Sequence, residues 1–255
     1  MPIAQPPRVL ITRPELQSLS LAQASKALGF SVSLLPCVDI QPLSIDPTAL
    51  EQALEQHDKV LFTSANAVRC AHRIINLPWQ TIDVHAIGDA TARALAGFGQ
   101  SLTIQPMAPF NSEAYLLQQQ NKSPGSLLII KGLGGRDLVQ SRLQELNWKV
   151  STLDVYVRQL PVLQPRKLVE LFDDTPPDVA CISSDEILLN LLTLCEQHTE
   201  RLQKMDLIVN SQRCAKLAVN KGFTGQVRVA DPPGDNGQLS CLERWQQERV
   251  TLVTR

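Results

Sequence analysis

The sequence predicts an α/β protein made of two similar units, each with a parallel sheet covered by helices. Three observations lead to this fold class. Short β-branched runs alternate with helical patterns, which is typical of parallel sheets. The same order of elements occurs twice along the 255 residues. The polar, proline-containing segments between elements have the length of loops and not of long tethers.

The first βα unit of the chain covers residues 8–43. Residues 8–14 predict a strand that ends in a turn. Leu16, Leu19 and Leu28 then fall near helical spacing, and Gly29 closes the helix. Residues 30–43 are extended and are interrupted by Pro36. This stretch therefore predicts a strand, a helix and a further extended segment.

Two more βα units follow in the first half. Residues 58–68 predict a strand that breaks into a helix at a Ser-Asn cap. Residues 84–99 predict a strand, a glycine turn and an alanine-rich helix closed by Gly97 and Gly99. The second half repeats this order, with 126–161 parallel to 8–42, 177–192 parallel to 58–74, and 205–223 parallel to 82–99.

Two proline-ended extended segments lie at matching places in the two copies. They are residues 36–42, PCVDIQP, and residues 153–161, LDVYVRQLP. We interpret them as connectors between the units, so that a cleft between the units would be the natural ligand site. The repeat alone suggests a contiguous division of the chain near residue 123.

Composition excludes several classes of function. Hydrophobic residues make up 44% of the chain, charged residues 19% and aromatic residues 4%, with a net charge of -1. We therefore expect a globular protein with neither a basic surface nor aromatic stacking platforms for nucleic acid. No stretch approaches the roughly 20 apolar residues of a membrane span, and the N-terminal residues do not resemble a signal peptide.

The six cysteines are scattered and form no C-x-x-C pair. This pattern favours reduced thiols in a cytoplasmic protein over disulfides or a zinc site. The four histidines also lack metal-ligand spacing, and we expect them to be surface or packing residues. No conventional catalytic set is visible.

The segment KGLGGRD, residues 131–137, places three glycines between a predicted strand and a helix. Gly132 and Gly134 fit the start of a dinucleotide fingerprint, but Asp137 occupies the position of its third glycine, and no Walker loop is present. A tight turn without a ligand is one interpretation. The other is a turn whose backbone N–H groups, with Arg136 and Gly135, bind an anion.

Small polar residues follow several other predicted strands. Helix capping alone would explain them. Because ligands of open α/β sheets bind outside the carboxyl ends of the strands, these turns also predict a rim that holds carboxylates by neutral hydrogen bonds. The residues are Ser64, Asn66, Gly88, Thr91, Ser183 and Ser184.

Tyr156 is one of only two tyrosines and lies on a predicted connector. It is either a packed, half-buried strand residue or a weak acid that reaches into the cleft. The residues alone leave both interpretations open.

Six segments occur in an order and spacing that resemble the uroporphyrinogen-III synthase family of the bacterial type. They are VLITRP (9–14), FTSANAV (62–68), AIGDATARAL (86–95), LIIKGLGGRDLV (128–139), LDVYVR (153–158) and ISSDEILLNLL (182–192). The resemblance implies two flavodoxin-like lobes joined by a two-stranded β connector. It implies a first lobe of residues 1–36 and 161–255, a second of 42–153, and connecting strands at 37–41 and 154–160.

The resemblance also implies a lyase without cofactor or metal. The implied reaction is closure of hydroxymethylbilane, a linear tetrapyrrole with eight carboxylates, to uroporphyrinogen III. Water is lost, and the last pyrrole ring is inverted through a spiro intermediate. By carry-over, Tyr156 is the proton donor for the leaving hydroxyl, a role that suits a phenol because it is protonated at neutral pH.

The substrate contacts that the resemblance implies extend over both lobes. One departure from the family pattern is NSQRCA at residues 210–215, where Arg213 and Cys214 replace hydroxyl residues. Either Arg213 replaces the hydrogen bonds of those hydroxyls with a charged contact, or this turn contributes little to substrate binding. The implied contacts are Thr12, Arg13, Ser64, Asn66, Gly88, Thr91, Gly132, Gly134, Gly135, Arg136, Ser183, Ser184 and Ser211.

Two other functions stay open at this point. One is a non-catalytic two-lobed sensor that closes on an anionic metabolite, although no DNA-binding helix pair is evident. The other is a degenerate nucleotide-binding enzyme that uses the KGLGG turn. For the enzyme we expect a monomer in the cytoplasm, with hydroxymethylbilane as its partner and neither nucleic acid nor membrane.

Overall fold

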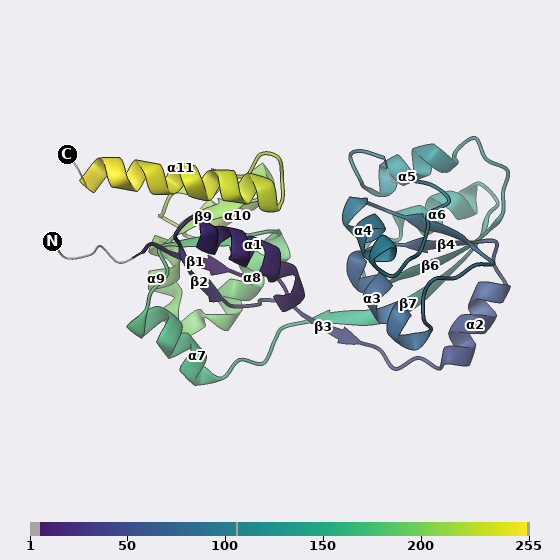
Figure 1. Cartoon of the computed structure of the whole chain (residues 1–255), viewed down its shortest axis with the longest axis horizontal. Coiled ribbons are helices and arrows are strands. Elements are labelled where there is room, and N and C mark those ends of the chain that lie inside the picture. The colour runs from purple at the N-terminus through teal and green to yellow at the C-terminus, as the bar shows by residue number, and fades with distance from the viewer. Residues whose placement is uncertain (1–5, 106, 254–255) are drawn as a thin grey trace. The chain divides into compact units, whose positions relative to one another are not determined.

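The structure is a computed structural model that describes residues 6–105 and 107–253 (Figure 1). The chain forms two compact units, and the chain passes between them twice. Unit 1 comprises the described parts of Met1–Asp39 and Gln159–Arg255, and unit 2 is Ile40–Arg158. Each unit carries one five-stranded sheet. The prediction of an α/β protein with two mostly parallel sheets is confirmed.

Unit 1 has the strand order β10-β9-β8-β1-β2, and the neighbouring strands are parallel. Numbered within the unit, this is the order 2-1-3-4-5 read from β2, which is that of flavodoxin-like folds. The elements of unit 1 are β1 (Arg8–Ile11), α1 (Glu15–Ala27), β2 (Ser31–Leu34), α7 (Pro165–Val169), the π-helical η1 (Glu170–Asp174), β8 (Val179–Ile182), α8 (Asp185–Leu194), the 3₁₀ turn η2 (Glu196–His198), α9 (Thr199–Lys204), β9 (Asp206–Val209), α10 (Gln212–Asn220), β10 (Val227–Val229) and α11 (Asp235–Val253).

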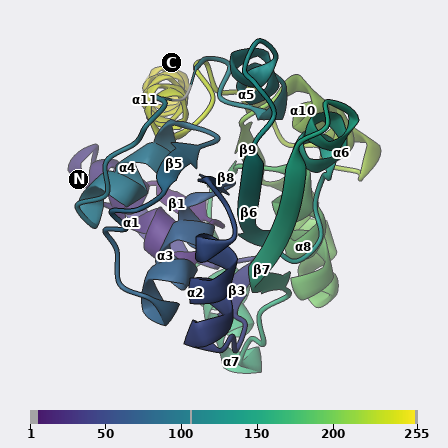
Figure 2. The same cartoon turned by 90° about the vertical axis from the view of Figure 1, so that its right-hand side faces the viewer.

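The sheet of unit 2 has the order β3-β7-β6-β4-β5. Figure 2 shows the long β7 of this unit beside β6. Its elements are β3 (Asp39–Pro42), α2 (Pro47–Glu55), β4 (Lys59–Phe62), α3 (Ala65–Ile74), β5 (Asp83–Ala86), α4 (Asp89–Gly97), α5 (Ser112–Gln119), β6 (Ser126–Gly132), α6 (Leu138–Glu145) and β7 (Lys149–Gln159).

The internal repeat of the sequence corresponds to equivalent positions in the two sheets. Strand β8 takes the place in unit 1 that β4 takes in unit 2, and β9 takes the place of β5. Likewise β1 is equivalent to β6, and β2 to β7. Each copy of the repeat therefore contributes strands to both sheets, which pairs segments far apart in the sequence, such as Val9 with Val179.

Both faces of the unit 2 sheet are buried, which explains why its strands are apolar throughout rather than alternating. On β4, Val60 and Phe62 pack with α3 and α4, whereas Leu61 packs on the opposite face with α5 and α6. Successive side chains of a strand point to opposite faces, so one strand supplies both cores. The helix after β4 and the helix after β6 thus cover different faces.

In unit 1, α1 and α11 cover one face of the sheet, where Trp245 packs against Phe30. The helix α1 was predicted, but two of the leucines whose spacing indicated it do not lie on its buried face. Leu16 and Leu19 are 64% and 55% exposed, and α1 instead buries Leu21 together with the small residues around it. The buried face of α1 consists of Leu21 with Ser18, Ala22 and Ser25, and it lies on the side of the sheet that α11 also covers.

Candidate active site

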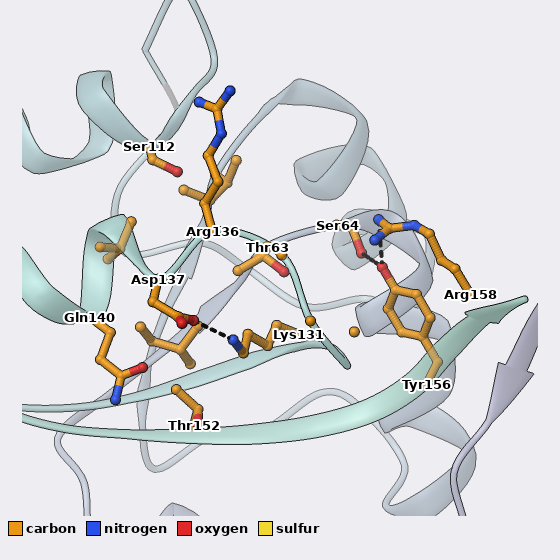
Figure 3. A pocket seen from close by; sticks show the side chains of 16 residues that line it. Thr63, Ser64, Ser112, Lys131, Arg136, Asp137, Gln140, Thr152, Tyr156 and Arg158 are labelled. Atoms are coloured by element: carbon orange, nitrogen blue, oxygen red, sulfur yellow. Dashed lines mark hydrogen bonds and ion pairs between the residues drawn. The ribbon is translucent and has the colours of Figure 1, made fainter. Parts of the chain in front are cut away.

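A pocket of about 200 Å³ lies at the carboxyl edge of the unit 2 sheet, where β4 and β6 end (Figure 3). The chain leaves β4 toward α3 on one face and leaves β6 toward α6 on the other. This divergence opens a crevice at the switch point of an α/β sheet, which is the usual ligand position. The pocket is lined by Thr63, Ser64, Ile87, Ser112, Ile129, Lys131, Gly132, Gly134, Gly135, Arg136, Asp137, Val139, Gln140, Thr152, Tyr156 and Arg158.

The three glycines of the KGLGG turn line this pocket for two different reasons. Gly134 and Gly135 have φ angles of +76° and +95°, which L-residues with side chains rarely adopt. Gly132 lies against the ring of Tyr156, and a Cβ atom there would be 2.5 Å from the tyrosine Cζ. The turn therefore needs glycine for its backbone shape and for the close approach of one aromatic ring.

Tyr156 is held at the pocket by contacts on several sides. Its hydroxyl lies 3.1 Å from the Ser64 Oγ and accepts a hydrogen bond of 3.1 Å from Arg158. Its backbone carbonyl accepts a 2.7 Å hydrogen bond from the Leu133 N–H. The pairing of β6 with β7 shifts here, so that Gly132 lies opposite Tyr156. The side chain is only 1% exposed although it lines the pocket.

Cationic side chains dominate the charge of the pocket wall. Lys131 pairs with Asp137 at 2.7 Å, while Arg136 lies 3.9 Å from Glu113 and is 75% exposed. Figure 3 shows the Arg136 side chain pointing away from the phenol of Tyr156. With Arg158, three cations and one lining carboxylate surround the cavity. Such a wall suits an anion, and Arg136 is one of the residues that line it.

Ser64 has a second structural role, as the N-cap of α3. Its Oγ accepts a 3.1 Å hydrogen bond from the Ala67 N–H. Ser184 and Ser211 cap α8 and α10 in the same way, accepting from Ile187 and Cys214. The capping interpretation therefore holds for Ser64 and Ser184, and Ser211 is a further cap that was not predicted. Each of the three side chains lies at the carboxyl edge of its sheet.

Three predicted contact residues of unit 2 do not line the pocket. Thr91 lies within α4 and is only 4% exposed, so its hydroxyl is inside the unit and not on a rim. Asn66 is in the first turn of α3, where it accepts a hydrogen bond from Arg69. Gly88 is the N-cap of α4, and a Cβ there would lie 3.3 Å from Phe110.

The predicted contacts of unit 1 gather at the ends of its adjacent strands β1, β8 and β9. Thr12 is fully buried, and its hydroxyl donates a 2.7 Å hydrogen bond to the Cys181 carbonyl. Arg13 forms an ion pair with Asp235. Ser183 is half-buried between β8 and the cap Ser184. These residues occupy the switch point of unit 1, between β1 and β8.

The structure also shows the contacts of Arg213 and Cys214, the two residues that depart from the family pattern. Arg213 pairs with Asp185 at 2.7 Å and remains 74% exposed. Cys214 is buried, and this burial raises the pKa of its thiol to about 11. Cys214 is thus a core residue that does not present a polar group in place of a hydroxyl.

Sequence reasoning missed Arg158 and Lys131 as residues of the pocket. Arg158 lies two positions after Tyr156 on β7, and residues i and i+2 of a strand point to the same side. That spacing would have pointed to Arg158. Lys131 immediately precedes the glycines, yet its ion pair with Asp137 depends on the path of the turn.

The histidines pack as expected. His72 stacks on Phe98, and His198 stacks on Phe172. Among residues 6–105 and 107–253, no group of three or more histidine, cysteine or acidic side chains lies together as metal ligands would. Within the same residues, no helix has the length and apolarity that crossing a membrane requires.

The family model described as "Uroporphyrinogen-III synthase HemD" matches residues 20–237, which is most of the chain. The chain belongs to the uroporphyrinogen-III synthase family. The resemblance seen in the six sequence segments is thereby confirmed, as is the prediction of a lyase of this type, which acts in porphyrin biosynthesis.

Relatives in this family match along nearly their whole length. Uroporphyrinogen-III synthase of Escherichia coli K12 is 26% identical over 245 residues, covering 92% of this chain and 99% of the relative. That of Salmonella typhimurium is 27% identical with the same coverage.

Solved structures agree in fold. Uroporphyrinogen-III synthetase from Helicobacter pylori aligns with a TM-score of 0.62 at 16% identity, covering 92% of this chain and 98% of that one. A mutant uroporphyrinogen III synthase from Thermus thermophilus aligns with a TM-score of 0.57 at 18% identity, covering 95% and 99%. At these identities the structures support the two-sheet fold of the family, while the residue roles have to come from this chain itself.

Proposed function

We propose that this chain closes hydroxymethylbilane to uroporphyrinogen III, with loss of water and inversion of the last pyrrole ring. The observation that carries the proposal is the family match over residues 20–237. The pocket of unit 2 supports it independently. It lies at a switch point and combines a phenol, backbone N–H groups and cations, which suit an acidic substrate whose reaction starts with protonation of a hydroxyl.

The proposed reaction begins at the hydroxymethyl group of the first ring. The phenol of Tyr156 gives its proton to the hydroxyl, which leaves as water with the electron pair of the C–O bond. The pyrrole nitrogen supplies electrons, producing an electrophilic azafulvene. General acid catalysis of this kind contributes about 10²–10⁴-fold.

Ring inversion follows without further groups from the protein. The azafulvene carbon is attacked by the substituted α carbon of the last ring, which gives the spiro intermediate. The older bond at that carbon then breaks, and the released carbon bonds to the free α carbon of the same ring. Loss of the proton on that carbon restores the pyrrole and balances the proton given by Tyr156.

The cavity size defines how much of the substrate the pocket takes. Sites for whole drug-sized ligands are about 300–1,000 Å³, so a cavity of about 200 Å³ suits one ring with its acidic side chains. In the proposal, backbone N–H groups of the Gly134–Gly135 turn and Arg136 bind those carboxylates. The carboxyl edge of unit 1, with Arg13, Ser183, Ser184 and Ser211, binds others. Catalysis then comes mainly from holding the linear tetrapyrrole bent so that its two end rings meet. Such a proximity effect lowers activation barriers by about 7–11 kcal/mol.

The test is an isomer analysis of the porphyrin formed from hydroxymethylbilane. The proposal predicts the type III isomer; the type I isomer alone, which forms spontaneously, would contradict it and favour a non-catalytic sensor of anionic metabolites. Stabilisation by ATP or NAD in a thermal-shift screen would instead indicate a nucleotide-binding enzyme.

The chain offers a matched control for the role of Tyr156. Its second tyrosine, Tyr115, is equally buried but lies outside the pocket and hydrogen-bonds to His85 at 2.8 Å. We expect Tyr156→Phe to lower kcat by about 10²-fold or more with little loss of stability. Tyr115→Phe should keep the rate. Full activity of Tyr156→Phe would assign the proton transfer to water or to the substrate.

A further inference from the structure

Arg158 makes a contact with Tyr156 that the proposed function leaves unused. Its Nη2 lies 3.1 Å from the phenol oxygen, and its guanidinium carbon lies 5.5 Å from the ring centroid. Within unit 2, over residues 40–105 and 107–158, no carboxylate forms an ion pair with Arg158. Within this unit the charge of Arg158 is therefore directed at the phenol.

The hydrogen-bond roles of the three side chains are unequal. A guanidinium has donors only, so Arg158 always occupies an acceptor position of the phenol oxygen. Ser64 already accepts the Ala67 N–H at 3.1 Å. Its hydroxyl either donates to the phenol or accepts from it. In every arrangement the phenol proton points away from Arg158, toward Ser64 or the pocket.

The contact between Arg158 and the phenol oxygen becomes more stabilising as negative charge develops on that oxygen during the reaction. When the phenol gives up its proton, negative charge develops on the oxygen that Arg158 already contacts. A fixed donor aimed at such a charge stabilises the transition state more than the ground state. Gly132 leaves room for the ring on one side while Arg158 holds the oxygen on another, so the phenol does not need to reorganise.

We propose that Arg158 is a positioning residue for Tyr156. It directs the phenol proton away from the guanidinium group and stabilises the negative charge left on the phenol oxygen. This inference rests on the proposed function, because it assigns Arg158 to the proton transfer by Tyr156. This positioning role differs from a role of Arg158 in binding substrate carboxylates, because carboxylate binding by Arg158 would not depend on Tyr156.

A double-mutant cycle separates these roles. We compare Arg158→Met, Arg158→Lys, Tyr156→Phe and the double variant Arg158→Met/Tyr156→Phe, measuring kcat and KM for type III product from hydroxymethylbilane. Arg158→Met should lower kcat about 10–100-fold with KM changed less than about threefold. Arg158→Lys keeps the charge and should recover most of that loss. In the Tyr156→Phe background, Arg158→Met should have no further effect beyond about twofold.

Two additional measurements keep the outcome clear. Arg142→Met removes an exposed arginine that pairs with Glu145 and lies outside the pocket, and it should leave kcat and KM unchanged. Circular dichroism and thermal midpoints report whether each variant folds. If Arg158→Met fails to fold, the neutral variant Arg158→Gln and its combination with Tyr156→Phe complete the cycle.

Each result decides between the inference and the function on which it rests. A KM increase of equal size in both backgrounds, or full additivity in kcat, would overturn the positioning role and make Arg158 a substrate-binding residue. In that case the loss caused by Tyr156→Phe would still stand. Absence of type III product from the wild-type chain would refute the function itself, and an undiminished rate of Tyr156→Phe would refute the acid role alone.

Discussion

Replacing Gly132 by alanine tests the central contact of the pocket. The backbone of Gly132 does not have a positive φ, so an alanine fits its strand conformation. The added Cβ, however, would lie 2.5 Å from Tyr156 Cζ, 2.6 Å from Cε2 and 2.9 Å from the hydroxyl oxygen. Carbon atoms in contact are normally about 3.5–4.0 Å apart, so the ring must retreat by about 1 Å.

The retreat should affect both stability and activity. Overpacking of a filled site costs about 1–3 kcal/mol of unfolding free energy. A displacement of about 1 Å in a catalytic group lowers the rate by up to about 10²-fold. It would also lengthen the contacts of the phenol with Ser64 and Arg158, both of which are 3.1 Å. We expect Gly132→Ala to approach Tyr156→Phe in its loss of kcat.

Urea denaturation and the isomer assay measure the two effects. In a Tyr156→Ala background the ring is gone, so Gly132→Ala should then cost less than about 0.5 kcal/mol. Gly97→Ala is the matched control, since no atom lies within 4 Å of its added Cβ and its φ is not positive. A Gly132→Ala variant with unchanged stability and rate would show that the ring of Tyr156 does not lie against this strand.

Three further predictions concern groups outside the pocket. Burial lowers the pKa of His85 to about 4, below the value near 6.5 of an unfolded chain, so neutral His85 stabilises the fold above pH 6.5 and that stability is lost as pH falls toward 4. Unfolding free energy should fall by roughly 2 kcal/mol between about pH 7 and pH 5 from this group, and His85→Gln should show a correspondingly smaller fall in urea titrations. Thr12→Val removes the hydrogen bond to the Cys181 carbonyl and should lower stability by about 1 kcal/mol in the same assay, while a neutral result would mean that the bond adds nothing. Because burial raises the pKa of the Cys181 and Cys195 thiols to about 12, native protein at about pH 8 should resist iodoacetamide at both sites, and mass spectrometry that finds rapid labelling before urea is added would contradict their burial.

Much of the local structure could be predicted because it depends on neighbours in the sequence. Serines that precede helical patterns are N-caps at Ser64 and Ser184, as predicted. In the turn after residue 131, Gly134 and Gly135 have positive φ angles. Glycine is favoured at such positions by the local backbone conformation alone, so the sequence could indicate this turn. The long helix α11 escaped prediction, although its Trp245 fills the core of unit 1.

The candidate site was predicted only in part. Ser64 and the glycines lie at the carboxyl ends of β4 and β6, and Tyr156 lies on β7 opposite the end of β6, so these residues come together at one edge of the sheet. Thr91 could not be placed correctly, since a threonine in a first helical turn faces either the rim or the interior, and only the packing of α4 decides which.

The strand–helix alternation, the internal repeat and the glycine requirement of one turn could be read from the residues alone, because periodicity and backbone freedom are properties of short segments. Three features became known from the folded chain: β1 pairs with the distant β8, α1 exposes Leu16 and Leu19, and Arg158 reaches the phenol of Tyr156. These outcomes depend on which distant surfaces pack together. A periodic pattern shows that a segment has a face to bury, but the shape and hydrogen-bond needs of the partner decide which face it is.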